Sequence, residues 1–130
     1  MKRAIIILGA VLLFLFILAA TGVYISCEIA IKRNIEVAKS LHPGKAEDAL
    51  IAYLLDSTIS VNERSKVAVW TLGQIGSQKA KPFLLNLYKN DPKGKTCFKR
   101  HHTVFCQSNL YKSLNAIQSN GWPLHRHLNK

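Results

Sequence analysis

The feature that most constrains this chain is an uncharged stretch near its N-terminus. Residues 4–27 read AIIILGAVLLFLFILAATGVYISC and contain no Asp, Glu, Lys or Arg. As a helix, such a run is long enough to cross a hydrocarbon layer about 30 Å thick. Tyr24 stands near its far end, where aromatic residues are enriched at a membrane interface. The run therefore predicts a single transmembrane anchor, and most of the 130 residues remain for a soluble part.

Two other interpretations of this segment stay open. A cleaved signal peptide has a shorter apolar region, of roughly 7–15 residues, although the small residues at 20–22 resemble a cleavage site. The letters YISC resemble a lipoprotein motif that would modify Cys27. For an uncleaved anchor, the positive charges of Lys2 and Arg3 favour an N-terminus in the cytoplasm.

Apolar residues recur at helical spacing through the soluble part, so the fold is predicted to be all-α. Ile31, Ile35 and Ala38 fall on one face of a helix that is expected to leave the membrane after a break near Ser26. The predicted divisions are an anchor at 1–27, a juxtamembrane helix and turn at 28–45, a helical domain at 46–120 with an insert at 92–106, and a basic tail at 121–130. Helices within the domain are expected at 46–56, 64–75, 78–89 and 107–119.

Two glycines and a proline predict a sharp reversal between two of these helices. Gly76 stands just past a helix end, where a left-handed backbone is needed and a residue without Cβ avoids the steric penalty. Gly73 lies within the last helical turn, where it costs about 1 kcal/mol of helix propensity relative to Ala. We therefore expect a neighbouring helix to approach Gly73 too closely for a Cβ. Ser77 is expected to cap the next helix after a connection of one or two residues, with Pro82 in its first turns.

This stretch resembles a helical repeat family. The order TLGQIG, followed by Ala80, Pro82 and Leu84, is similar to the HEAT-like repeat, in the variant also found in phycobilin lyases, over about residues 61–91. A weaker copy begins at Leu110, about 40 residues later. The resemblance implies two helix pairs, 46–56 with 64–75 and 78–89 with 107–119, that present a binding surface. The residues that carry it are Leu72, Gly73, Ile75, Gly76, Ala80, Pro82 and Leu84.

The segment TCFKRHHTVFCQ places Cys97 and Cys106 symmetrically about a His-His pair. If the cysteines are bonded, His101 and His102 form the turn of a small β-hairpin stapled by a disulfide. Closing a loop of this length stabilises a domain by about 3 kcal/mol in the chain-entropy model. A disulfide also implies an oxidising compartment, and so a domain outside the cytoplasm. Two alternatives are free thiols and a metal site, whose candidate ligands are Cys97, Cys106, His101, His102, His125 and His127.

Positive charge gathers in the last third of the chain. Residues 92–130 contain seven basic residues and no acidic one, within a net charge of +11 for the whole chain. We interpret this segment as a basic surface that is either solvated or in contact with anionic lipid, at up to about 1 kcal/mol per nearby Lys or Arg. Nucleic acid is disfavoured as a partner if the domain lies outside the cytoplasm. The predicted basic surface consists of Lys93, Lys95, Lys99, Arg100, Lys112 and Arg126.

No constellation of side chains in the sequence indicates catalysis. The carboxylates are scattered, and no glycine-rich phosphate loop precedes a helix. Trp70 and Trp122 are expected to serve packing rather than ligand stacking. We therefore expect a non-catalytic protein without a cofactor: a membrane-anchored interaction module, or an accessory of a membrane complex, with an unknown protein partner. The alternatives are a metal-binding protein that uses the Cys/His cluster and a basic domain that contacts anionic lipid.

Overall fold

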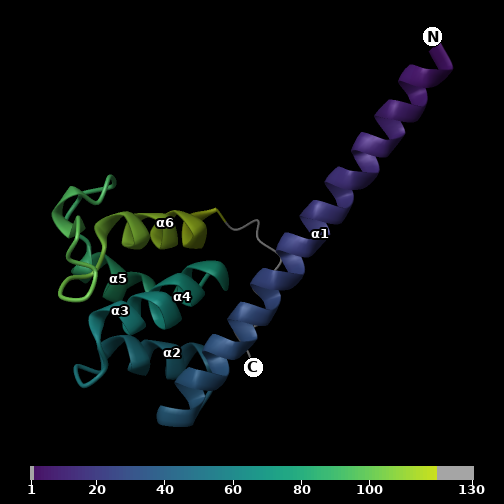
Figure 1. Ribbon diagram of the computed structural model, residues 1–130. Helices are drawn as coiled ribbons and strands as arrows, with labels where there is room; N and C mark the ends of the chain where they lie inside the picture. Colours follow the sequence, from purple (N-terminus) through teal and green to yellow (C-terminus); the bar gives the residue numbers. More distant parts are fainter. Residues whose placement is uncertain (1, 120–130) are drawn as a thin grey trace. The chain divides into compact units, whose positions relative to one another are not determined.

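A computed structural model describes residues 2–119, and within that range every regular element is a helix, without a strand, as the sequence predicts. The long first helix is followed by short helices joined by turns (Figure 1). Two elements depart from α-helical geometry: η1 is a π-helical stretch and η2 is a single 3-10 turn. The elements are α1 (Lys2–Leu41), α2 (Ala46–Leu55), α3 (Val61–Arg64), η1 (Ser65–Val69), α4 (Trp70–Gln74), α5 (Lys81–Leu87), η2 (Lys95–Cys97) and α6 (Gln107–Gln118).

The chain divides into two compact units, residues 1–30 and residues 31–130. In the first unit the large apolar side chains of α1 are exposed along the helix. The helix is long and apolar enough to cross a membrane, a test that a signal sequence near an N-terminus would also pass. The break expected near Ser26 is wrong, because its hydroxyl donates to the carbonyl of Gly22 at 2.8 Å without interrupting the helix.

The second unit begins with the last turns of α1. Ile31, Ile35 and Ala38 are all buried, which confirms the apolar face read from their spacing. Asn34 lies on a neighbouring part of the same turns, and its amide donates to the hydroxyl of Thr71 at 2.9 Å. One face of residues 31–41 therefore packs into the domain core, while the opposite face is exposed.

The two predicted helix pairs are in contact in the structure. Helix α2 packs against η1 and α4, and α5 packs against α6. Contacts of α4 with both α2 and α6 join the pairs, so α2, α4 and α6 lie as successive layers in Figure 1. The largest fully buried side chains come from α1, from the two helix pairs and from the turn after α4: Ile31, Leu50, Leu54, Val69, Thr71, Leu72, Ile75, Leu84, Leu110 and Ile117.

The reversal after α4 has the predicted left-handed glycine. Gly76 has φ +69°, and the amide of Ser77 donates to the carbonyl of Leu72 at 3.0 Å, which closes the helix end. The predicted length of the connection is wrong: it spans residues 75–80, because α5 begins only at Lys81. The side chain of Ser77 caps this intervening turn, accepting from the amide of Ala80 at 3.0 Å.

The close helix approach expected at Gly73 is confirmed. A Cβ built on Gly73 would lie 2.8 Å from the Cα, Cβ and Oγ of Ser113 in α6. Such a distance is far inside van der Waals contact. Ser113 also donates its hydroxyl to the carbonyl of Val69 at 2.8 Å, and both groups are buried. The missing side chain of Gly73 therefore sets the spacing between α4 and α6.

Candidate functional site: a cationic pocket and a disulfide-closed loop

A pocket of about 310 Å³ opens where η1 and α4 meet α6. Two lysines and one indole stand out in its wall, namely Lys66, Lys112 and Trp70. The remaining lining side chains are small or carry amides. We call this feature the cationic pocket; its lining consists of Ser65, Lys66, Trp70, Gln74, Asn109, Lys112 and Ser113.

The π-helical stretch η1 shapes one wall of the cationic pocket. The amide of Trp70 bonds to the carbonyl of Ser65, five residues back, in place of the usual four. This wider turn is supported from outside, because the Asn34 amide reaches the carbonyl of Lys66 at 3.4 Å as well as Thr71. Single π turns of this kind often occur at functional sites.

Helix α6 supplies the other wall. Asn109, Lys112 and Ser113 stand at i, i+3 and i+4, so they share one helical face. The close approach at Gly73 and the bond from Ser113 to Val69 hold that face against η1 and α4. The pocket is thus formed by residues more than 30 positions apart in the sequence.

The cationic pocket has donors and an apolar surface, and none of the described residues that line it carries a carboxylate. Lys66 and Lys112 are exposed, so their ammonium groups are free of the cost of burial. The side-chain amides of Gln74 and Asn109 form no hydrogen bond with another residue within 2–119. Trp70 is half-buried, and its side chain also lines the pocket. Packing, the role expected for Trp70, therefore does not account for the whole side chain. Trp122 lies outside the described residues.

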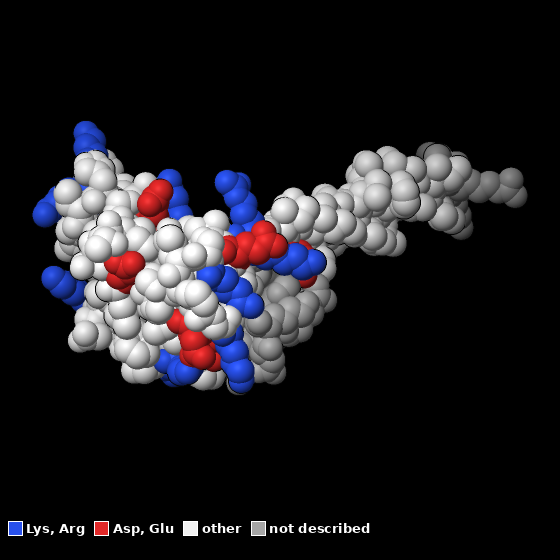
Figure 2. All heavy atoms as spheres, turned by 90° about the horizontal axis from the view of Figure 1, so that it is seen from below, with Lys and Arg blue, Asp and Glu red and all other residues white. Residues whose placement is uncertain are grey.

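The predicted basic surface is dispersed. Lys93, Lys95, Lys99 and Arg100 are exposed on the connection between α5 and α6, whereas Lys112 is exposed on α6 in the cationic pocket. Arg126 lies outside the described residues. On the face drawn in Figure 2, basic side chains alternate with acidic ones and do not merge into one field.

The predicted disulfide between Cys97 and Cys106 is confirmed, and both cysteines are buried. Their Cα atoms are 5.0 Å apart, within the range for a disulfide. The predicted β-hairpin is wrong, since residues 95–97 form the 3-10 turn η2 and Lys99 has φ +59°, which an extended strand cannot include. The turn at the two histidines does exist: the carbonyl of Arg100 accepts from the amide of Thr103 at 3.0 Å.

Asp91 fixes the backbone just before the loop that the disulfide closes, residues 97–106. Its carboxylate accepts from the amide of Thr96 at 2.8 Å and from the hydroxyl of the same residue at 2.9 Å. These bonds, the one from the amide first, hold the pKa of the Asp91 carboxyl below its ordinary value. Gly94, at φ +67°, allows the tight turn between the two residues. The loop is therefore held both by the disulfide and by the hydrogen bonds that the Asp91 carboxylate accepts just before it.

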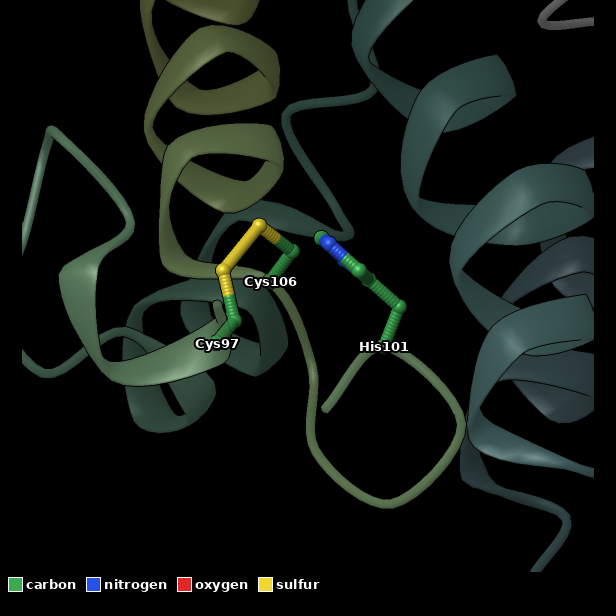
Figure 3. A group of neighbouring side chains, drawn as sticks. All are labelled: Cys97, His101 and Cys106. Atoms are coloured by element: carbon green, nitrogen blue, oxygen red, sulfur yellow. A yellow bond between two sulfur atoms is a disulfide. The ribbon is translucent and has the colours of Figure 1, made fainter. Parts of the chain in front are cut away.

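Only His101 of the predicted metal ligands lies with the cysteines in the described part of the chain. The two sulfur atoms and one ring nitrogen of His101 are all within 4.8 Å of one another, and Figure 3 shows the imidazole directed toward Cys106. His102 is exposed and is not a member of this group. His125 and His127 lie outside the described residues.

A second cavity, of about 430 Å³, adjoins the same connection and is lined in part by Lys89, Arg100 and Gln107. The amide of Gln107 is already engaged there, donating to the carbonyl of Leu87 at 3.2 Å and accepting from the amide of Lys89 at 2.5 Å. Part of its polar lining is therefore already engaged in internal hydrogen bonds, unlike the amides of Gln74 and Asn109 in the cationic pocket.

Comparisons of the chain with known proteins found no similar protein. No family model matches the chain, and neither a curated protein nor a solved structure matches it. The resemblance to the HEAT-like repeat thus stays a prediction from residues 61–91, and the candidate site depends on its own geometry.

Proposed function

We propose that this protein is a membrane-anchored, non-catalytic interaction module whose cationic pocket binds an acidic segment of a protein partner. The observation that carries the proposal is the lining of the pocket: Lys66 and Lys112 with Trp70 and no carboxylate. A HEAT-like helical repeat, as the sequence suggests, would suit this role because such repeats commonly present binding surfaces.

The chemistry of the pocket favours a peptide with a carboxylate and an aromatic side chain. A carboxylate between Lys66 and Lys112 would make charge-assisted hydrogen bonds, and a ring would pack on the indole of Trp70. Gln74 and Asn109 each offer both a donor and an acceptor, which matches the N–H and C=O groups of a peptide backbone. The phosphodiester of a lipid headgroup offers acceptors only, so it would use the amide N–H groups and leave the amide carbonyls to water.

The proposed location is a single-pass anchor with the N-terminus in the cytoplasm and the second unit outside it. Lys2 and Arg3 precede the apolar helix, and positive residues are retained on the cytoplasmic side. The bonded cysteines suit an oxidising compartment. A reporter fused to the C-terminus, active only in the cytoplasm, should be inactive; an active reporter would contradict this orientation.

The binding proposal is tested with a displayed peptide library and the full chain in detergent micelles. We expect selection of peptides with Asp or Glu next to an aromatic residue. A synthetic peptide from the selection is then titrated against three chains: the wild type, the double variant Lys66→Glu/Lys112→Glu, and the control Lys93→Glu. Lys93 is an exposed lysine of the predicted basic surface that does not line the pocket.

The double variant should weaken peptide binding by about tenfold, since exposed ion pairs contribute roughly 0.2–1 kcal/mol each. The control should bind as the wild type does. Equal losses in the double variant and in Lys93→Glu would contradict the proposal. So would preferential binding of all three chains to vesicles of anionic lipid over the peptide, which would support the lipid-contact interpretation instead.

A further inference from the structure

The disulfide-closed loop holds a nitrogen donor beside two sulfur atoms. Cys97 ends η2, Cys106 immediately precedes α6, and His101 lies at the turn between them (Figure 3). The cysteines are buried and His101 is exposed, so the sulfurs have a fixed setting and the imidazole is at the surface. In the oxidised chain the sulfurs are bonded to each other and are not thiolate ligands.

We propose that the reduced chain binds one Zn²⁺ ion through Cys97, Cys106 and His101, and that the disulfide and the metal exclude each other. This inference is independent of the proposed partner. Thiolate and imidazole are ordinary zinc ligands, at about 2.3 Å and 2.0–2.1 Å from the ion. Three protein ligands leave the fourth position of a tetrahedral site for water.

The rearrangement needed to bind the ion is small. Donors that share a tetrahedral zinc ion lie roughly 3.5–4 Å apart, so the two bonded sulfurs must separate to that distance on reduction. The imidazole nitrogen of His101, already within 4.8 Å of both sulfurs, must move slightly closer to them. The intervening residues 98–103 are all exposed, so the turn can move without disturbing the core.

The chemistry balances with a dithiol as the reductant. Two electrons and two protons pass from the dithiol to the Cys97–Cys106 bond, so that two thiols form here and the reductant becomes a disulfide. Binding of Zn²⁺ then displaces the two thiol protons to solvent. The dithiolate neutralises the charge of the ion.

The test uses the full chain in micelles, in a Cys27→Ser background that removes the free thiol outside the loop. The protein is reduced with a dithiol, desalted without oxygen and titrated with Zn²⁺ in competition with a chromophoric chelator. Co²⁺ serves as a second probe, because thiolate ligands produce a charge-transfer absorption. Variants are Cys97→Ser, His101→Ala and the matched control His102→Ala, the adjacent exposed histidine.

We expect one Zn²⁺ per reduced chain and none per oxidised chain. Cys97→Ser should at least halve the intensity of the cobalt charge-transfer band, because only the Cys106 thiolate remains, and His101→Ala should weaken zinc binding at least tenfold. His102→Ala should leave the affinity unchanged, and circular dichroism should confirm that every variant stays helical. Stoichiometric binding to the oxidised chain, no binding to the reduced chain, or equal affinities for the two histidine variants would each overturn the proposal.

Discussion

Replacing Gly73 with Ala should destabilise the second unit, although Ala is the better helix former. Helix propensity alone favours the substitution by about 1 kcal/mol. Against it, the new methyl group would lie 2.8 Å from the backbone Cα of Ser113 as well as from its side chain, so the two helices must move apart. Overpacking of this kind costs typically 1–3 kcal/mol. Displacing Ser113 also weakens its buried bond to Val69, worth about 0.5–1.5 kcal/mol.

The expected net change is a loss of about 1–3 kcal/mol in the free energy of unfolding. For a domain of this size, each kcal/mol lowers Tm by roughly 4–8 °C. Circular dichroism of the full chain in micelles, followed during denaturant and thermal unfolding, measures the change. The control is Gln74→Ala at the next position of the same helix, whose half-exposed side chain makes no comparable contact and should change stability by less than about 0.5 kcal/mol.

A double-mutant cycle with Ser113→Gly isolates the clash. That change removes two of the three atoms within 2.8 Å, so the double variant should be less destabilised than the sum of the single ones. If Gly73→Ala alone proves neutral or stabilising, helix propensity dominates, and the interpretation of Gly73 as the spacer between α4 and α6 is wrong.

Three further predictions concern the turn and the loop. Gly76→Ala should cost about 1–2 kcal/mol in unfolding experiments, because the backbone there is left-handed; an unchanged midpoint would contradict this. The double variant Cys97→Ser/Cys106→Ser should lower the free energy of unfolding by about 3 kcal/mol. The reduced wild type should be destabilised by the same amount, and a reduced chain as stable as the oxidised one would contradict this prediction. Asp91→Asn should be less stable than the wild type at neutral pH. Because the folded pKa of Asp91 is depressed, its contribution is present above the unfolded pKa of about 4 and is lost as the pH falls through the folded value; a difference that persists in acid would refute the assignment.

Several elements could be read from the sequence because their causes are local. The 24 uncharged residues at 4–27 define an apolar helix by composition alone. The spacing of Ile31, Ile35 and Ala38 predicted a buried face, since helical periodicity brings them to one side. Gly76 was identifiable because few other residues tolerate its backbone angle.

The loop shows where local reasoning fails. Its symmetry about two histidines correctly indicated the pairing of Cys97 with Cys106 and the position of the turn, but it also suggested strands. An isolated pair of short strands has little stability, whereas Asp91 and the left-handed Lys99 direct the backbone into successive turns. The sequence also offered no reason to prefer His101 over His102 as a metal ligand. Only the folded loop shows that His101 lies beside the sulfurs.

The sequence by itself determined the long apolar N-terminal helix, the order of the helices, the reversal at Gly76 and the cysteine pair, because each follows from composition, periodicity or a single residue's conformational limits. Only the tertiary structure decided the cationic pocket. Its walls come from η1, α4 and α6, and their separation depends on an absent Cβ at Gly73 and on the hydroxyl of Ser113. The widened turn beside Trp70 is supported by an amide from α1. Such features arise when segments distant in sequence compete for the same space, and no local pattern encodes the outcome.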